Sequence, residues 1–534
     1  MLLLQNLGYN HPNKDVLFDG LNLAIGRHQK AALIGNNGAG KSTLLRLLAG
    51  ELKPTTGLVH AEAAPYYVPQ HFGQFDAWTV AQALRIDAKL AALHEILDGQ
   101  ATEANLATLD DDWTLEERSH DALRHWGLAD VHLTQRLSNL SGGQKTKIFL
   151  VGLTLHQPAL VLLDEPSNHL DTAGRQLLYH YIRTTASTLL VVSHDRQLLH
   201  LLDAVCELSK RGLTLYGGKY EFYAEQKQVE SNALQQDVQS RTSALRKARE
   251  TEREALERKH KLDARGRKHQ AKAGLPTIVL NMMRNSAENN SSRLKGIHAE
   301  KVEALAQELS ELRQELPDLD KMKFGFDDSG LHRGKILFDA HGLNYHYGPH
   351  PLWPENLSFQ IVSGERLALK GLNGSGKTTL LRLLLGELEP TRGTLLRAAS
   401  KVVFIDQEYS LLQPQLSVYV QAQQFNTAGL QEHEVKIRLT RFLFTAPYWD
   451  KPCGTLSGGE KMRLLLCCLH LSHHAPDLII LDEPTNNLDL QNLEILAAAL
   501  HDYRGTLLLV SHDELFLQQL GVERAIHLSS PPST

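Results

Sequence analysis

Cysteine is scarce in this chain, and long apolar runs are absent. The four cysteines among 534 residues are Cys206, Cys453, Cys467 and Cys468. Their spacing forms neither a CxxC pair nor a disulfide framework, so free thiols in a reducing cytosol are expected. No apolar stretch approaches the ~20 residues that a membrane-crossing helix needs. The sequence therefore argues against a disulfide scaffold, a cysteine-held cluster and a membrane span.

The chain also lacks a strong excess of charge of one sign. Its net charge is −5 and its isoelectric point is near 6.6, so any nucleic-acid surface must be local. Met1–Leu4 resembles a strand, and neither a basic segment before it nor a small-residue cleavage site after it marks a secretion signal. We expect a cytoplasmic globular protein with several domains.

One set of motifs occurs twice. The Gly-rich segment 35–42 returns as segment 371–378, and each copy is followed by Leu-Ser-Gly-Gly, by an apolar run ending in Asp-Glu-Pro, and by Ser-His-Asp. Two copies of this length indicate two domains rather than a solenoid. The predicted division is a first domain at 1–221, a linker at 222–333 and a second domain at 334–534.

Short apolar runs alternate with helical stretches in both copies. Continuous apolar strands separated by helices predict an α/β fold with a largely parallel sheet that is covered on both faces. The predicted strands are Ala31–Ile34, Leu160–Leu163 and Thr188–Val192, and in the second copy Arg366–Leu369, Leu478–Leu481 and Thr506–Val510.

The Gly-rich segments lie between a strand and a helix, which is the context that a P-loop requires. Backbone N–H groups of such a loop surround phosphates, and the helix N-terminus adds its dipole. The lysine is expected to reach the β- and γ-phosphates, and the following hydroxyl to ligate Mg²⁺. The predicted ATP-binding residues are Gly35, Asn36, Asn37, Gly38, Ala39, Gly40, Lys41, Ser42 and Thr43, with Gly371, Leu372, Asn373, Gly374, Ser375, Gly376, Lys377, Thr378 and Thr379.

Acidic, imidazole and amide side chains follow the other predicted strands. Asp164 and Asp482 are expected to hold Mg²⁺, and the adjacent Glu165 and Glu483 to polarise the attacking water as general bases. The corresponding histidines and glutamines are expected to contact the γ-phosphate, the metal or that water. They are His194, His512, Gln70 and Gln407.

The Leu-Ser-Gly-Gly segments each open a helix and form a second anion-binding N-terminus. Since each half already has a P-loop, this second cradle is expected to face the γ-phosphate held by the other half. Two such halves packed antiparallel would make two composite sites. The cradle residues are Ser141, Gly142, Gly143, Ser457, Gly458 and Gly459.

Two helices are predicted between the repeats, at 222–271 and 293–316, as a projecting hairpin. From Arg241 to Lys272 there are twelve Lys/Arg and five Asp/Glu. This local excess suggests a polyanion contact, although a solvated helix carrying i,i+4 pairs would look the same. A helical insertion at about 88–125 in the first domain alone suggests a docking arm or a longer loop.

These motifs, in this order and twice, resemble the ABC ATPase superfamily. Twin cassettes joined by a charged helical linker resemble the ABC-F family more narrowly, as do the segment 165–171 and the insertion with its Asp-Asp-Asp-Trp stretch. The resemblance implies ATP and Mg²⁺ as cofactors and a ribosome-binding translation factor near the tRNA exit site. It also implies a linker that reaches rRNA and peptidyl-site tRNA.

The chain departs from the family pattern at a few positions. Ser167 stands for Thr, Asn487 for His and Glu460 for Gln. By resemblance Tyr347 is expected to stack on adenine in the second domain. The first domain has His11 at the equivalent point, and its stacking residue stays open.

Several alternatives remain open at this stage. Twin cassettes could instead be the ATPase subunit of a membrane transporter, although such motors usually need only a short connection. DNA-repair ABC proteins need zinc cysteines or very long coiled coils, and ribosome-recycling relatives need an iron–sulfur cluster, none of which is present. Within the family, housekeeping and antibiotic resistance are both open, because the apolar segment 274–284 suits either insertion near the peptidyl-transferase centre or packing of the hairpin end.

Overall fold

The computed structural model describes residues 1–12, 15–209, 212–270, 299–312, 332–398, 400–472, 475–486 and 488–529. The chain forms two compact units. One contains residues 1–223 and 322–534, and the other is Ala224–Lys321. Within the described ranges no helix is both long and apolar enough to cross a membrane. All four cysteines are buried and unpaired, as predicted.

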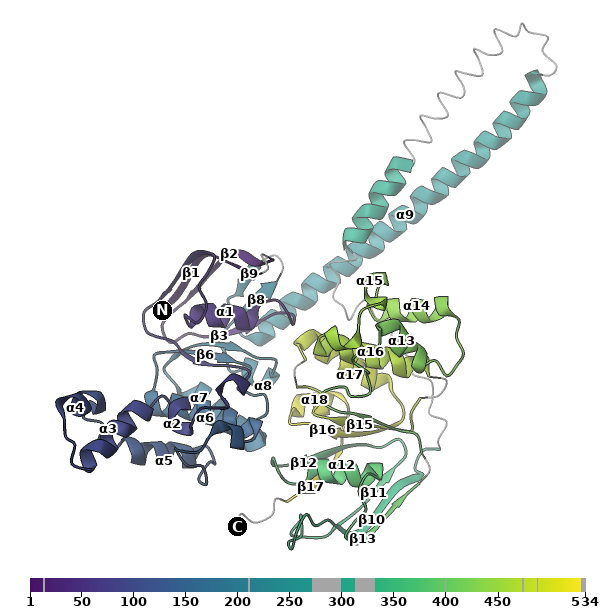
Figure 1. Ribbon diagram of the computed structural model, residues 1–534. Coiled ribbons are helices and arrows are strands. Elements are labelled where there is room, and N and C mark those ends of the chain that lie inside the picture. Colours follow the sequence, from purple (N-terminus) through teal and green to yellow (C-terminus); the bar gives the residue numbers. More distant parts are fainter. Residues whose placement is uncertain are drawn as a thin grey trace. The chain divides into compact units, whose positions relative to one another are not determined.

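The first of the two repeats, called the first half of the chain below, contains two sheets (Figure 1). A three-stranded antiparallel sheet has the order β2-β1-β4, and a six-stranded sheet has the order β5-β6-β7-β3-β8-β9, parallel except for β9. The strands are β1 (Leu2–Asn10), β2 (Val16–Ile25), β3 (Lys30–Ile34), β4 (Thr56–Ala61), β5 (Tyr66–Val68), β6 (Leu160–Asp164), β7 (Thr188–Val192), β8 (Ala204–Ser209) and β9 (Gly212–Tyr216).

The second half repeats this plan. Its antiparallel sheet has the order β11-β10-β13, and its parallel sheet has the order β14-β15-β16-β12-β17. The predicted α/β fold with two cassettes is confirmed. The strands are β10 (Ile336–Asn344), β11 (Leu357–Val362), β12 (Arg366–Gly371), β13 (Arg392–Arg397), β14 (Val402–Ile405), β15 (Leu478–Asp482), β16 (Thr506–Val510) and β17 (Arg524–Leu528).

The parallel sheet of the first half is buried on both faces, which explains its continuous apolar strands. Along β3, Ala32 and Ile34 belong to one hydrophobic cluster, whereas Ala31 and Leu33 belong to another. Every residue of β6 and β7 is buried. Because side chains alternate across a strand, helices on both sides must cover the sheet.

Helices follow the strands at equivalent places in the two halves. In the first half these are α1 (Lys41–Leu48), α6 (Gly142–His156), α7 (Thr172–Thr184) and α8 (Arg196–Leu199). The matching helices are α12 (Lys377–Leu385), α16 (Gly458–Leu471), α17 (Leu490–Asp502) and α18 (Glu514–Gln519). Short 3₁₀ turns η1 (Gly73–Phe75), η2 (Leu137–Asn139) and η3 (Cys453–Thr455) lie between them.

A helical subdomain lies between β5 and α6, and its counterpart between β14 and α16. The predicted insertion is helical, and Leu97, Leu106 and Trp113 are exposed on it. Its role in docking stays a prediction. The helices are α2 (Val80–Ala83), α3 (Asp87–Leu97), α4 (Glu103–Leu109) and α5 (Leu115–His125), against α13 (Val418–Gln424), α14 (Glu432–Arg441) and α15 (Ala446–Trp449).

The linker unit is helical in its described part, as the sequence predicts. Helix α9 (Tyr220–Gln270) is 51 residues long, and residues 299–312 form a second helix. Leu245 and Leu309 are buried, and Arg241 pairs with Glu308 at 3.3 Å across the two helices. The apolar segment 274–284 lies outside the described residues.

Candidate functional site

The first P-loop runs from β3 into α1 and needs glycine for its shape. Gly38 and Gly40 have φ of 82° and 96°, a region that other residues rarely adopt. The ammonium of Lys41 donates to the carbonyls of Gly35 at 2.6 Å and Asn36 at 3.2 Å. The carbonyl groups at the start of the loop thus face the lysine that is expected to meet phosphate oxygens.

The second P-loop has the same geometry. Gly374 and Gly376 have φ of 81° and 87°, and Lys377 donates to the carbonyls of Gly371 at 2.8 Å and Leu372 at 3.3 Å. The two loops therefore offer the same lysine and the same turn into a helix N-terminus.

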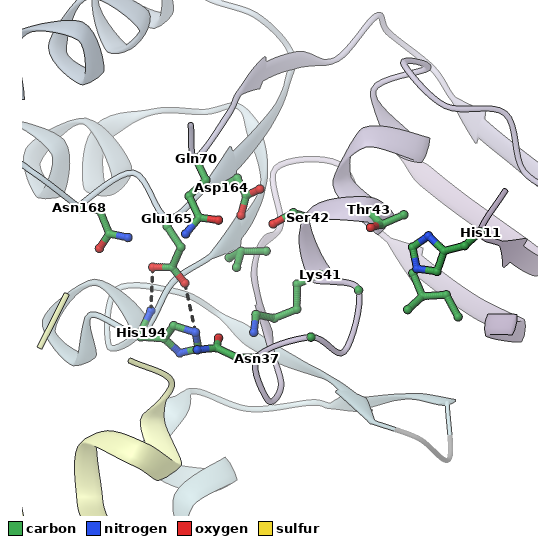
Figure 2. A pocket seen from close by; sticks show the side chains of 14 residues that line it. His11, Asn37, Lys41, Ser42, Thr43, Gln70, Asp164, Glu165, Asn168 and His194 are labelled. Carbon is green, nitrogen blue, oxygen red and sulfur yellow. Dashed lines mark hydrogen bonds and ion pairs between the residues drawn. The ribbon is translucent and has the colours of Figure 1, made fainter. Parts of the chain in front are cut away.

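A cavity of about 430 Å³ opens beside the first P-loop (Figure 2). The predicted site residues that line it are Asn37, Gly38, Gly40, Lys41, Ser42, Thr43, Gln70, Asp164, Glu165 and His194. Of the described residues that line it, none belongs to the segments Ser141–Gly143 or Ser457–Gly459. The structure therefore brings together the residues of one half, without the predicted cradle of the other.

Both predicted general bases lie at the end of a strand in a strained backbone conformation. Glu165 has φ of 50° and Glu483 has φ of 48°, and such left-handed angles are uncommon for residues with a side chain. Each N–H donates at 2.8 Å to the next strand, to Val192 and Val510 respectively. The same uncommon backbone angle therefore recurs at both predicted bases.

A histidine faces each of these glutamates. The Nε2 atom of His194 lies 3.2 Å from Oε1 of Glu165, and the backbone N–H of His194 donates to Oε2 at 3.3 Å. In the second half, Nε2 of His512 lies 3.3 Å from Oε1 of Glu483. Neither Nε2–Oε1 approach has the orientation of a hydrogen bond, since Oε1 of Glu165 and Nε2 of His512 are buried without such a partner.

Burial dominates the electrostatics of both sites. It raises the pKa of Glu165 to about 8, against the opposing charge of Lys41, and raises the pKa of Glu483 to about 7. It lowers the pKa of His194 to about 3 and that of His512 to about 4. Each site therefore holds a carboxyl group whose pKa lies near neutral pH, beside an imidazole that is uncharged at that pH.

The residues beside the first P-loop suit a hard divalent cation such as Mg²⁺. Burial raises the pKa of Asp164, and its side chain hydrogen-bonds to Ser42 and Tyr67. Its Oδ1 atom is buried and has no hydrogen-bond partner in the described part of the chain. Mg²⁺ prefers such oxygen ligands and usually completes its shell with phosphate and water.

The Leu-Ser-Gly-Gly segments open helices as predicted. The hydroxyl of Ser141 caps α6 by accepting from the N–H of Gln144 at 3.3 Å, and Ser457 caps α16 in the same way through Glu460. The carboxylate of Glu460 also accepts from the N–H and hydroxyl of Ser457, at 2.8 and 2.9 Å. Glutamate in place of glutamine therefore preserves the capping box.

The first half's cradle lies next to the second P-loop. A Cβ atom placed on Gly143 would lie 3.1 Å from Nδ2 of Asn373. That amide donates to the carbonyl of His169 at 3.2 Å. The predicted pairing of one half's cradle with the other half's P-loop therefore has a structural counterpart at the second site, while the first P-loop contacts Asp489 instead.

The remaining predicted residues are placed differently in the two halves. Gln70 lines the first cavity, whereas Gln407 is exposed. Tyr347 is 65% exposed, and its hydroxyl lies 3.1 Å from the hydroxyl of Thr379. His11 lines the first cavity, so a ring is present at the point equivalent to Tyr347. Asn487 lies outside the described residues.

Sequence reasoning missed several residues that line the first cavity. Asn168 lies in the segment 165–171, and Leu17 and Val192 are apolar positions without a motif of their own. A signal for Asn168 existed, because Asn486 occupies the same place in the second copy. Contacts between the halves, such as that of Thr172 with His512, left no trace in the motifs.

Two P-loops, each with an Asp-Glu pair and a histidine at the ends of neighbouring strands, define a twin-cassette ATPase. The model of the protein family described as "ABC transporter" matches residues 18–168 and 354–486. The chain is 31% identical to the putative ATP-binding protein YdiF of Bacillus subtilis (strain 168), over 97% of this chain and 78% of that protein. It is also 31% identical to the tylosin resistance ATP-binding protein TlrC of Streptomyces fradiae, over 93% and 92%.

Among solved structures, the archaeal ribosome recycling factor aABCE1, in complex with the ribosomal stalk protein aP1, has a similar fold. The TM-score is 0.60 at 20% identity, over 98% of this chain and 87% of that chain. The chain belongs to the ABC-F family of ATP-binding proteins, and it is an ATPase.

Proposed function

We propose that the chain is a translation factor that binds the ribosome near the tRNA exit site under the control of ATP. Membership of the ABC-F family supports a ribosomal partner. The observation that carries the proposal is the presence, in one chain, of two ATPase sites and a linker, helical in its described part, whose sequence has twelve Lys/Arg against five Asp/Glu from Arg241 to Lys272. Such a local excess of positive charge in the sequence of an acidic protein suits an RNA backbone.

The domain division follows the same proposal. Residues 1–221 and 334–534 are the two ATPase domains, and 222–333 is the linker that contacts rRNA and peptidyl-site tRNA. The insertion at 88–125 is a second ribosome contact. The protein works in the cytoplasm as a monomer whose two domains pair with each other.

Each site is proposed to use the residues described above in fixed roles. Lys41 and Lys377 bind the β- and γ-phosphates, and Asp164 and Asp482 hold Mg²⁺ with the P-loop hydroxyls of Ser42 and Thr378 and with Gln70 and Gln407. Bound Mg²⁺ supplies charge neutralisation for the phosphates.

The remaining roles concern the attacking water and the contact between the domains. Glu165 and Glu483 accept a proton from water, and His194 and His512 donate an N–H toward the γ-phosphate. The cradles Ser141–Gly143 and Ser457–Gly459 face the ATP of the other domain. ATP acts as a switch only if it favours the closed pair strongly, by about 5 kcal/mol for a nearly complete shift.

A ribosome sedimentation assay tests the proposal. The double variant Glu165→Gln, Glu483→Gln is expected to stay on 70S ribosomes with ATP and to be released with ADP. Neutralising three exposed linker residues, Arg246, Lys247 and Arg249, is expected to weaken this retention.

Two outcomes would contradict the ribosomal role. One is ribosome binding that ignores nucleotide. The other is ATP-dependent recovery in the membrane fraction without ribosomal RNA, which would support a transporter ATPase. Changing Glu250 and Glu254 to Gln provides a control of opposite sign, since it should not weaken RNA binding. Comparing drug susceptibility of cells with and without the protein separates antibiotic protection, suggested by the name of the relative TlrC, from housekeeping translation.

A further inference from the structure

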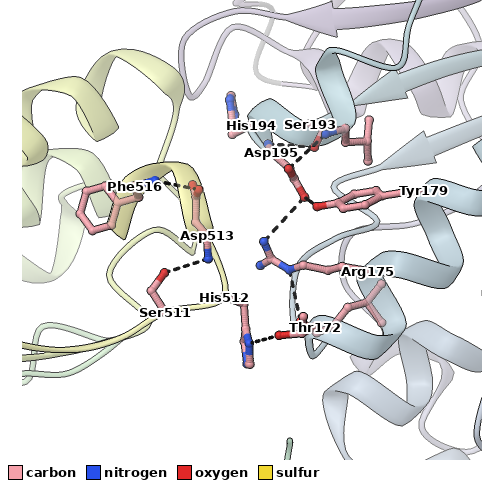
Figure 3. Close-up of polar contacts among 12 residues, drawn as sticks. Thr172, Arg175, Tyr179, Ser193, His194, Asp195, Ser511, His512, Asp513 and Phe516 are labelled. Atoms are coloured by element: carbon pink, nitrogen blue, oxygen red, sulfur yellow. Dashed lines mark hydrogen bonds and ion pairs between the residues drawn. The ribbon is translucent and has the colours of Figure 1, made fainter. Parts of the chain in front are cut away.

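A hydroxyl from the first cassette contacts the histidine of the second site. Thr172 is the first residue of α7, and its Oγ1 atom lies 3.1 Å from Nδ1 of His512 (Figure 3). The position of Thr172 is fixed because Asp171 caps α7 by accepting from the N–H of Gly174 at 2.9 Å. The contact is therefore built into a capped helix start rather than made by a free loop.

The Thr172 hydroxyl can pair with Nδ1 of His512 as donor or as acceptor, so the surroundings of Nε2 select the tautomer. Burial keeps the imidazole neutral at neutral pH, because it lowers the pKa of His512 to about 4. When the Thr172 hydroxyl donates to Nδ1, the proton resides on Nε2, which lies 3.3 Å from Oε1 of Glu483. The opposite tautomer would place a lone pair against that carboxylate. The charge of the carboxylate thus favours the tautomer with an N–H at Nε2, and the Thr172 hydroxyl holds the ring in place by pairing with the free Nδ1.

The first site lacks an equivalent hydroxyl. The repeat offset of 318 residues, from His194 to His512, places Leu490 where the first cassette has Thr172. Leu490 packs against the hydrophobic core of the first cassette and cannot donate a hydrogen bond. Nδ1 of His194 is buried and has no hydrogen-bond partner in the described part of the chain.

A charge difference accompanies this difference in hydrogen bonding. Arg175, one turn after Thr172, is buried and lies 3.6 Å from Asp195. Its positive charge also lowers the pKa of Glu483, against the larger effect of burial. The same offset places Leu493 at the position of Arg175, so Glu165 receives no such charge from the second cassette's helix. Both differences, in hydrogen bonding and in charge, favour ATP hydrolysis at the second site over the first.

We propose that Thr172 is a positioning residue for hydrolysis at the second site, acting through His512, and that the two sites of this chain turn over ATP unequally, the second faster. The inference rests on the proposed roles of Glu483 and His512. It assigns to the first cassette a residue that completes the site of the second.

Single-site variants of the full chain test this inference. In the Glu165→Gln protein only the second site hydrolyses ATP. There, Thr172→Val is expected to lower kcat about tenfold with little change in KM, as for loss of a partner that orients an imidazole. Thr172→Ser, which keeps the hydroxyl, is expected to retain kcat within about twofold. Thr184→Val, at the other end of α7, is the matched control, since its hydroxyl donates to the carbonyls of His180 and Tyr181 within the same helix.

The complementary background separates positioning from folding. In the Glu483→Gln protein only the first site works, and Thr172→Val should leave its rate unchanged. An equal loss in both backgrounds, or an unchanged rate in the Glu165→Gln background, would overturn the inference. So would faster turnover by the first site than by the second. Full hydrolysis by the double Gln protein would instead refute the proposed base roles, a result that is distinguishable because it does not involve Thr172.

Discussion

The backbone N–H of Asn37 in the first P-loop donates to Oδ2 of Asp489 in the second cassette at 3.0 Å. Asp489 also caps α17, accepting from the N–H of Asn492 at 2.8 Å, and its charge acts on Lys41. A carboxylate thus occupies an N–H group of a loop whose chemistry is to bind anions. Asp489 and the nucleotide phosphates therefore interact with the same loop.

Asp489→Asn should raise the ATP affinity of the first site. Asparagine is as good a helix cap as aspartate, so α17 should stay intact while one negative charge leaves the loop. Removal of a partly screened like charge is worth about 1 kcal/mol, or roughly a fivefold change in Kd. A fluorescent ATP analogue, titrated into a Lys377→Ala background so that only the first site binds, measures the change. An unchanged or weaker affinity, with the melting temperature preserved, would contradict it.

Asp164→Asn should stabilise the nucleotide-free protein while it abolishes hydrolysis at the first site. Asp164 is 1% exposed, and burial raises its pKa because the ionised form is desolvated. The neutral amide escapes this penalty, and a gain of about 1 kcal/mol corresponds to a melting temperature about 2–4 °C higher.

Loss of the carboxylate should at the same time remove Mg²⁺-dependent turnover, measured in the Glu483→Gln background. Chelation of Mg²⁺ in the unmodified protein should reproduce the loss of hydrolysis without the thermal gain. A lower melting temperature together with full activity would show that Asp164 serves the fold rather than the metal.

Much of the architecture could be predicted from the sequence, because the strands of a doubly covered sheet are continuous apolar runs. The runs at Leu160–Leu163 and Thr188–Val192 correspond to β6 and β7. The P-loop was equally predictable, since its glycines reflect backbone angles that only glycine adopts easily, as at Gly40.

Contacts between the cassettes could not be predicted in the same way. Arg196 lies 3.3 Å from Glu494 of the second cassette and also hydrogen-bonds to Tyr220, where α9 begins. These residues are separated by up to 298 positions, and neither pairing belongs to a periodic pattern or a motif. Single-sequence reasoning detects local geometry, whereas such pairs depend on how two folded surfaces meet.

A charge swap tests the pair between Arg196 and Glu494. Glu494→Lys should place two positive charges together and weaken the paired state, raising the KM for ATP a few-fold, since an exposed pair is worth up to about 1 kcal/mol. Adding Arg196→Glu should restore the pair with reversed signs. Steady-state hydrolysis at low salt measures both effects, and the difference should shrink at about 1 M salt, where the screening length is about 3 Å. Failure of the swap to rescue would show that Arg196 acts through Tyr220 alone.

Gly152 and Tyr66 form a small–large pair whose sizes differ in the second cassette. A Cβ atom on Gly152 would lie only 1.8 Å from the Tyr66 hydroxyl, which donates to the carbonyl of Phe149 at 3.2 Å. The repeat places Cys468 and Val403 at the equivalent points, so the helix there carries a larger residue than Gly152 and the strand a smaller residue than Tyr66. The sequence thus divides the side-chain volume between helix and strand differently in the two cassettes.

A double-mutant cycle on the full chain should reveal this compensation. Gly152→Cys alone should overpack the core and cost about 1–3 kcal/mol, and Tyr66→Val alone should leave a cavity that costs about 3 kcal/mol. Because each change makes room for the other, the double variant should lose less than the sum by about 1 kcal/mol or more. Thermal and urea unfolding of the four proteins measure this coupling. Additive losses would mean that α6 shifts away from β5 instead of packing against it, and that the size exchange between the two halves arose independently of this contact.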